Sequence, residues 1–123
     1  MKKILIVEDD AILLSTLADN FSHAGFEIIK AKDGEEGFAS ALSEKPDLIL
    51  LDILLPKMDG IAVLKKLRQE DWGKDIPVII LTNLNSPANV SEALEDMGEL
   101  KEYLVKSDLK IKDLIARVKE RLK

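Results

Sequence analysis

Residues 47–60 read DLILLDILLPKMDG, and this stretch decides the fold. Its apolar residues 48–51 run without interruption into the carboxylate of Asp52. A continuous apolar run of this length is typical of a strand that is buried on both faces of a parallel sheet. Residues 56–60 begin with proline and end with glycine, which is the composition of a loop. The stretch therefore predicts a central parallel strand that ends at an acidic residue.

Four other short runs have a similar apolar character; they lie at residues 4–7, 26–29, 78–81 and 103–105. Stretches with a helical spacing of apolar residues separate the runs. The residues expected to share the first helix face are Ile12, Leu13, Leu17 and Phe21. Gly25 is expected to end that helix as its C-terminal cap. Further helices are expected around residues 39–42, 61–67, 90–97 and 109–122.

Five strands that alternate with five helices predict a doubly wound α/β fold. Right-handed crossover connections and the size of the chain favour a flavodoxin-like (βα)5 arrangement, with a five-stranded parallel sheet of order 2-1-3-4-5. The sequence contains no internal repeat or linker, so residues 1–123 are expected to form one domain.

The composition excludes several classes of function. The 123 residues contain no cysteine, so neither a disulfide framework nor a thiolate metal site is available. A net charge of −5 without a dominant basic block argues against nucleic-acid binding within this chain. The first apolar run is too short for a signal peptide or a membrane span, so we expect a cytoplasmic protein that does not bind membranes.

Polar side chains follow the apolar runs, at the points where the predicted strands end. They are Glu8, Asp9 and Asp10 after the first run, Asp52 after the third, Thr82 after the fourth and Lys106 after the fifth. In open α/β sheets, ligands bind beyond the carboxyl ends of the strands, near the switch in strand order. Because these four strands are neighbours in the predicted order, their polar side chains should converge at one end of the sheet.

A convergence of carboxylates indicates a cation site. Carboxylates within a few ångströms of one another repel, and the pKa of some of them rises unless a cation is present. Carboxylate and carbonyl oxygens suit a hard divalent cation, and Mg²⁺ (or Mn²⁺) is commonly held together with water and phosphate oxygens. Lys106 and the Thr82 hydroxyl would contact the phosphoryl oxygens that the metal does not reach. Asp10 is expected instead to cap the following helix.

Five pieces of sequence carry a resemblance to a known family: ILIVEDD at 4–10, DG at 33–34, DLILLDILLPKMDG at 47–60, PVIILT at 77–82 and YLVK at 103–106. Each piece is weak alone, but the five occur in order and lie at the predicted strand ends. Over essentially its whole length the chain resembles the receiver domain of bacterial two-component response regulators, of the CheY-like, single-domain kind.

The resemblance implies a phosphoacceptor and a metal site. Asp52 is the nucleophile that takes a phosphoryl group from a phosphohistidine and forms an acyl phosphate. Asp9 and Asp52 ligate Mg²⁺, together with the backbone carbonyl of Leu54. Glu8 acts mainly through metal-bound water.

The resemblance also implies a switch and its partners. Thr82 and Lys106 bind the phosphorylated form, and Tyr103 changes rotamer with the state of Thr82. The donor would be a sensor histidine kinase or a histidine phosphotransfer protein, and the switched surface would act on a downstream protein. The chain takes part in its own phosphorylation and dephosphorylation, and we do not expect an enzyme that turns over an external substrate.

Three alternative functions fit the residues less well. A phosphatase of the aspartyl-phosphate type would need a second Asp two residues beyond Asp52, where this chain has Leu54. A flavin-binding electron carrier would need a loop that cradles phosphate after the first strand, where this chain has acidic residues 8–10. The alternative that stays open is a degenerate receiver that acts as a protein-binding module without phosphorylation.

Ser107 departs from the family pattern, in which a proline in a cis peptide usually follows the lysine of strand five. A non-proline cis bond costs roughly 3 kcal/mol, so the Lys106–Ser107 bond is expected to be either strained or trans. The sequence alone therefore leaves the direction of the Lys106 side chain open.

Two leucines near the phosphoacceptor generate a kinetic prediction. Leu54 and Leu84 lie two residues beyond Asp52 and Thr82, where relatives often carry polar groups that guide hydrolytic water. Leucine at both positions should exclude water and slow the loss of the phosphoryl group. We expect Leu84→Glu to shorten the lifetime of the acyl phosphate, measured as the decay of the phosphorylated mass with time. An unchanged lifetime would count against water exclusion.

Overall fold

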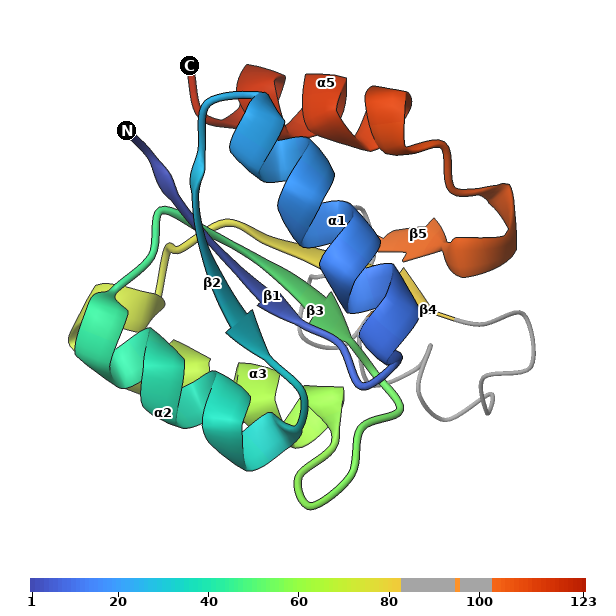
Figure 1. The fold of residues 1–123 in the computed structure, drawn as a ribbon. Helices are drawn as coiled ribbons and strands as arrows, with labels where there is room; N and C mark the ends of the chain where they lie inside the picture. The colour runs from blue at the N-terminus through green and yellow to red at the C-terminus, as the bar shows by residue number, and fades with distance from the viewer. Residues whose placement is uncertain (83–94, 96–102) are drawn as a thin grey trace.

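The computed structural model describes residues 1–82, 95 and 103–123, and in this part of the chain five parallel strands form one sheet (Figure 1). The strands are β1 (Lys3–Val7), β2 (Glu27–Ala31), β3 (Leu48–Asp52), β4 (Val78–Thr82) and β5 (Tyr103–Val105). Their spatial order is β2-β1-β3-β4-β5. The predicted fold class and the predicted strand order are both confirmed.

Helices cover both faces of the sheet (Figure 1). The helices are α1 (Ala11–His23), α2 (Gly34–Glu44), α3 (Gly60–Gln69) and α5 (Ile111–Arg121), with short 3-10 turns η1 (Asp71–Gly73) and η3 (Lys106–Asp108). Helices α1 and α5 pack on one face, and α2 and α3 pack on the other. The helix predicted around residues 90–97 lies almost entirely outside the described residues. Among the described helices, none combines the length and the apolar character that crossing a membrane requires.

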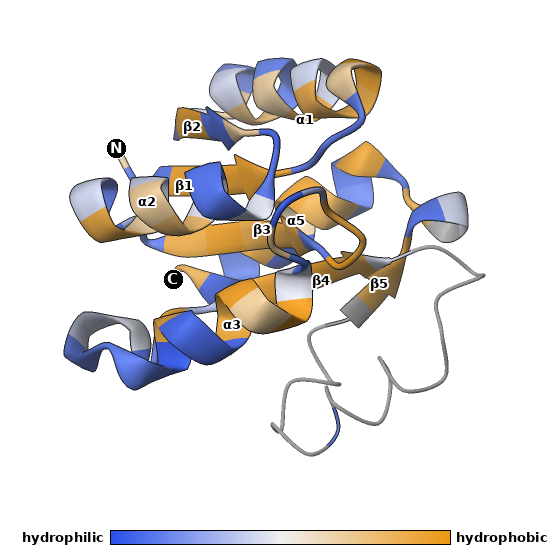
Figure 2. Ribbon diagram, turned by 90° about the horizontal axis from the view of Figure 1, so that it is seen from below, coloured by the Kyte–Doolittle hydropathy of each residue, from blue (hydrophilic) through white to orange (hydrophobic). Residues whose placement is uncertain are grey.

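The two faces of the sheet explain why the strand sequences are continuously apolar. Along β3, Ile49 and Leu51 pack toward α2 and α3, whereas Leu48 and Leu50 pack toward α1 and α5. Every residue of β3 is buried, and Figure 2 shows the hydrophobic strands between helices whose outer faces are largely hydrophilic. Burying one large aliphatic side chain contributes about 1.5–3 kcal/mol, so a strand with both faces covered gains from each residue in turn.

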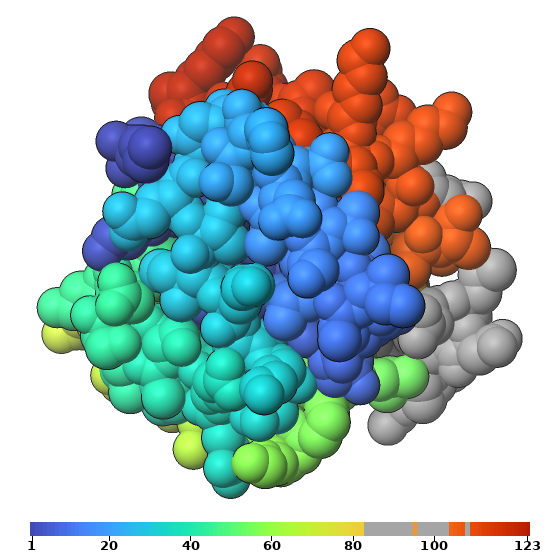
Figure 3. Space-filling view, viewed as in Figure 1, coloured from blue at the N-terminus to red at the C-terminus, as the bar shows by residue number. Residues whose placement is uncertain are grey.

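The edge strand β2 is less apolar because fewer elements cover it. Its exposed residues are Glu27 and Lys30, while Ala31 is buried. In the space-filling view, side chains of α1, β2 and α2 form a continuous near face (Figure 3). Charged residues on an edge strand also discourage pairing with another chain.

The strand register aligns the ends of the central strands. Val7 pairs with Leu51, so Glu8 follows β1 at the level where Asp52 ends β3. Thr82 in turn pairs with Val105, the last residue of β5. Parallel pairing therefore brings the carboxyl ends of β1, β3, β4 and β5 to one edge of the sheet, as the sequence predicts.

Aspartate side chains cap the helices that leave this edge. Asp10 accepts hydrogen bonds from the N–H groups of Ile12 and Leu13, which confirms its predicted role as an N-cap. Asp33 and Asp59 cap α2 and α3 in the same way. These three acidic residues are thus used to start helices, which typically contributes about 1 kcal/mol per cap.

The predicted face of α1 is partly wrong. Ile12 is 80% exposed, and Leu14 is buried in its place, beside Leu17 and Phe21. Asp10 is the N-cap, so α1 begins at Ala11. The orientation of the first turn of α1 relative to β1 decides which of its side chains contact the sheet. Gly25 does follow the end of α1, with a positive φ of 99° that favours glycine.

Gly60 fixes the start of α3 against the end of β3. Its N–H donates a hydrogen bond of 2.8 Å to the carbonyl of Ile53. A Cβ atom at this position would overlap the backbone oxygen of Asp52 and the Cα atom of Ile53. Because the obstructing atoms belong to the main chain, a side chain here would have to displace the residue that ends β3.

We therefore predict that Gly60→Ala lowers the free energy of unfolding by about 1–3 kcal/mol, the usual cost of overpacking. Lys65→Ala, an exposed substitution on the same helix, should change it by less than about 0.5 kcal/mol. Urea denaturation of the two variants and the wild type measures both values. Equal stabilities for all three proteins would contradict this packing argument.

Candidate functional site

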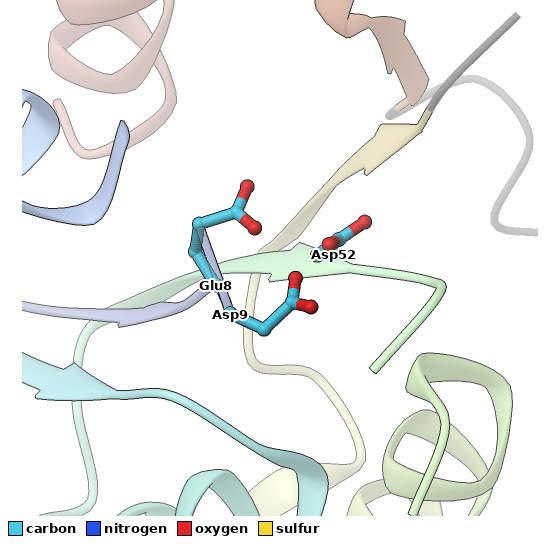
Figure 4. Close-up of side chains that lie close together, drawn as sticks. All are labelled: Glu8, Asp9 and Asp52. Atoms are coloured by element: carbon cyan, nitrogen blue, oxygen red, sulfur yellow. The ribbon is translucent and has the colours of Figure 1, made fainter. Parts of the chain in front are cut away.

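Three carboxylates converge beyond the ends of β1 and β3. Glu8, Asp9 and Asp52 each place an oxygen within 4.8 Å of the others, and Figure 4 shows all three side chains near a common space. Glu8 is 0% exposed and Asp52 is 2% exposed, whereas Asp9 is exposed. The predicted acidic cluster is therefore present, with two buried members and one on its open side.

Lys106 joins this cluster from the carboxyl end of the edge strand β5. Its Nζ atom lies 2.6 Å from Oε1 of Glu8 and 3.0 Å from Oδ2 of Asp52. The residue follows β5 directly and begins η3, and none of the described peptide bonds is cis, so the Lys106–Ser107 bond is trans. Even without a cis proline after it, the lysine points at Asp52.

The burial of the two acids sets the electrostatics of the site. Loss of solvation raises the pKa of Glu8 from 4.5 to about 7, although hydrogen bonds from Lys106 and from the N–H of Asp10 act in the opposite direction. Loss of solvation also raises the pKa of Asp52, against the hydrogen bond and charge of Lys106. Burial alone would lower the pKa of Lys106, but the hydrogen bonds that its ammonium group donates to Glu8 and Asp52, with the charges of these two acids, outweigh burial and raise that pKa.

These three pKa shifts accompany an unequal number of positive and negative charges in the site. A single ammonium group faces two buried carboxylates, so the lysine is well satisfied while the two acids together are not. Asp52 Oδ1 is buried and has no hydrogen-bond partner within residues 1–82, 95 and 103–123. Glu8 Oε1 also lacks a well-directed hydrogen bond, although its ion contact with Lys106 is short. An unpaired buried carboxylate oxygen is costly and points to a missing cation or donor.

A hard divalent cation fits this donor set. All the candidate ligands are oxygen atoms, and the uncompensated oxygen of Asp52 lies in the same cluster as the carboxylate of Asp9. One or two carboxylates with water and phosphate oxygens make a typical magnesium site. The acidic cluster is therefore compatible with Mg²⁺ binding.

The other predicted site residues differ in how far the structure describes them. Thr82 is fully buried at the end of β4, next to β5. Leu54 follows β3 with a side chain that is 44% exposed. Tyr103 lies in β5, but its side chain and the whole of Leu84 are outside the described part of the chain.

The structure also shows contacts that hold the loop after Asp52 in place and that the sequence did not predict. The Lys57 ammonium lies 3.6 Å from Oδ2 of Asp33, and the N–H of Gly34 donates to the carbonyl of Pro56 at 3.3 Å. A Cβ atom at Gly34 would overlap the carbonyl of Met58. The loop after Asp52 is thereby held against the start of α2. The DG pair at 33–34 is the sequence signal for this contact, but its partner is distant in the chain.

Comparison with known proteins identifies this arrangement. Residues 4–119 match the family model of the response regulator receiver domain. The DNA-binding dual master transcriptional regulator RpaA of Synechocystis is 35% identical over 123 residues, all of this chain and 50% of RpaA. The regulatory protein PhoP of Bacillus subtilis is 47% identical over 81 residues, which are 66% of this chain and 33% of PhoP. The chain thus spans half or less of the length of these relatives.

Solved structures agree over nearly the whole chain. A receiver-domain protein (CheY-like) from Methanospirillum hungatei has a TM-score of 0.87 and 30% identity, covering 99% of this chain and 94% of that one. The receiver domain of the Francisella response regulator 1452 has a TM-score of 0.83 and 32% identity, with full coverage of both chains. The acidic edge, the strand order and these matches lead to one conclusion: the chain belongs to the response regulator receiver domain family, the phosphoryl-accepting signalling modules of two-component systems.

Proposed function

We propose that Asp52 is the residue that accepts the phosphoryl group, from a sensor histidine kinase or a histidine phosphotransfer protein. The observation that supports this proposal is the state of its side chain: it is 2% exposed, and among the described residues Oδ1 has no hydrogen-bond partner while Oδ2 is held by Lys106. One oxygen is therefore free to form a bond while the other is fixed. The carboxylate lies in the acidic cluster, within reach of a bound metal.

The transfer itself is a balanced exchange of bonds. An oxygen of Asp52 forms a bond to phosphorus as the bond between phosphorus and the donor histidine nitrogen breaks, and that nitrogen keeps the electron pair. Lys106, 3.0 Å from the other oxygen, donates to the incoming phosphoryl group, and Thr82 at the end of β4 binds the product. Fixed donors of this kind stabilise charge that develops on the phosphoryl oxygens.

Asp9, Asp52 and the backbone carbonyl of Leu54 hold Mg²⁺ (or Mn²⁺) in this proposal, with Glu8 acting through metal-bound water. The bound cation supplies positive charge that offsets the repulsion between the phosphoryl group and the carboxylates. Asp9 suits direct ligation because it is the exposed member of the cluster, on the side from which a phosphoryl donor arrives.

The phosphorylated form switches a surface that binds a downstream protein, with Thr82 and Tyr103 as the switch residues. Residues 1–123 act as a single receiver domain in the cytoplasm, and the chain is not a turnover enzyme on an external substrate. The alternative of a degenerate module without phosphorylation is not favoured, because the acceptor, the acidic cluster and Lys106 are all present at one edge.

Phosphorylation of Asp52 predicts a defined change of mass. Incubation with acetyl phosphate and Mg²⁺ should add one phosphoryl group to the wild type, and Asp52→Asn should abolish the gain because an amide is a poor nucleophile. Asp59→Asn is the matched control, since Asp59 is exposed and asparagine also caps helices. Intact-mass spectrometry reads the result. A gain that survives in Asp52→Asn would refute this assignment.

Metal binding predicts a rise in thermal stability. At Mg²⁺ concentrations of about ten times Kd, binding should add about 1.4 kcal/mol, which raises Tm by roughly 5 °C for a domain of this size. Asp9→Asn should lose most of the shift because it removes a direct ligand, while Asp59→Asn should keep it. Thermal denaturation with and without Mg²⁺ measures the effect. An undiminished shift in Asp9→Asn would exclude that carboxylate as a ligand.

A further inference from the structure

Lys106 contacts Glu8 more closely than it contacts Asp52. Oε1 of Glu8 lies 2.6 Å from Nζ of Lys106, compared with 3.0 Å from Nζ to Asp52. Glu8 is completely buried and the Lys106 side chain is 16% exposed, so this ion pair is largely shielded from water. A buried ion pair fixes geometry more firmly than an exposed one, because neither partner has a solvated alternative nearby.

Glu8 is itself held from two directions. Its backbone N–H donates 2.9 Å to the carbonyl of Ala31 in β2. Its second carboxylate oxygen, Oε2, accepts a hydrogen bond of 3.1 Å from the N–H of Asp10, the residue that caps α1. The position of Oε1 is therefore set by β1, β2 and the start of α1 together.

The main-chain contacts around Lys106 fix its ammonium group less firmly than the contacts of Glu8 fix Oε1. It follows a strand of three residues and begins a 3-10 turn, which the N–H of Leu109 closes through a 3.1 Å hydrogen bond to the Lys106 carbonyl. This bond fixes the main chain at Lys106 but does not by itself set the rotamers of the four-carbon side chain. Ordering a lysine side chain costs about 1.5–2 kcal/mol of conformational entropy. An external partner is needed to hold the ammonium group at Asp52.

Asp9 does not share this role. It is exposed, and within the described part of the chain it forms no ion pair with Lys106, although its charge does act on Asp52. The two adjacent acids therefore have different surroundings: Glu8 contacts the lysine, and Asp9 is the exposed member of the cluster. Figure 4 shows that their side chains extend in different directions from the end of β1.

We propose that Glu8 is the positioning residue for Lys106, and that its buried carboxylate holds the ammonium group where the oxygens of the phosphoryl group arrive at Asp52. This inference rests on the proposed function and deepens it. It adds a second role for Glu8 to its action through metal-bound water: Asp9 ligates the metal, and Glu8 also holds the lysine.

A double-mutant cycle separates these two roles. At saturating Mg²⁺, Glu8→Gln should slow phosphorylation by acetyl phosphate about tenfold, the usual range for a residue that orients a functional group. In a Lys106→Met background the same substitution should change the rate by less than about twofold, because the group it positions is gone. Glu120→Gln, an exposed change on α5, is the control and should leave the rate unchanged. Equal losses from Glu8→Gln in both backgrounds, or full recovery with excess Mg²⁺, would overturn the proposal.

A second measurement needs neither phosphorylation nor the Lys106→Met protein. A lysine ammonium that is held in a buried ion pair exchanges its protons slowly enough to be seen by ¹⁵N NMR. The Lys106 signal should be present in the wild type and in Asp9→Asn, and it should be lost in Glu8→Gln. A signal that persists in Glu8→Gln would show that another group positions the lysine. If the wild type shows the signal but takes no phosphoryl group, the proposed function fails while the positioning role stands.

Discussion

Two buried carboxylates, Glu8 and Asp52, share the ammonium group of Lys106, and the rest of the site depends on this sharing. One positive charge makes the burial of two acids tolerable, but it leaves an oxygen of Asp52 without a partner. The desolvation of paired charges is repaid only when the geometry and the remaining hydrogen bonds are good. The ammonium group of Lys106 therefore offsets part of the cost of burying the two acids, and the remaining carboxylate oxygens make the cluster compatible with a bound cation.

The fold supplies this arrangement through strand register. Pairing of β1 with β3 sets Glu8 beside Asp52, and pairing of β4 with β5 brings Lys106 to the same edge. Aspartate caps and the close approach of Gly60 to the end of β3 fix where the chain leaves each strand. The positions of the Glu8, Asp52 and Lys106 side chains thus depend mainly on the backbone hydrogen bonds of the sheet. The conformations of the loops that follow the strands matter less.

Much of this was predictable because a two-sided parallel sheet leaves a strong sequence signal. The continuous apolar runs predict the strands, and right-handed crossovers with the size of the chain favour their order. The polar residues after the runs predict the acidic edge. Side-chain contacts were harder to predict. The contact of Glu8 with Lys106 joins residues that are distant in the chain, and the exposure of Ile12 depends on the orientation of the first turn of α1. The roles of Tyr103 and Leu84 stay predictions, since the described residues do not include their side chains.

The central claim is that the carboxylate of Asp52 becomes an acyl phosphate, and the most direct test identifies the modified residue without any mutation. Borohydride reduces an acyl phosphate to an alcohol, which converts a phosphorylated aspartate into homoserine. The wild type would be phosphorylated with acetyl phosphate and Mg²⁺, reduced, digested and mapped by peptide mass spectrometry. We expect homoserine at position 52; homoserine at position 9, or at no position, would refute phosphorylation of Asp52.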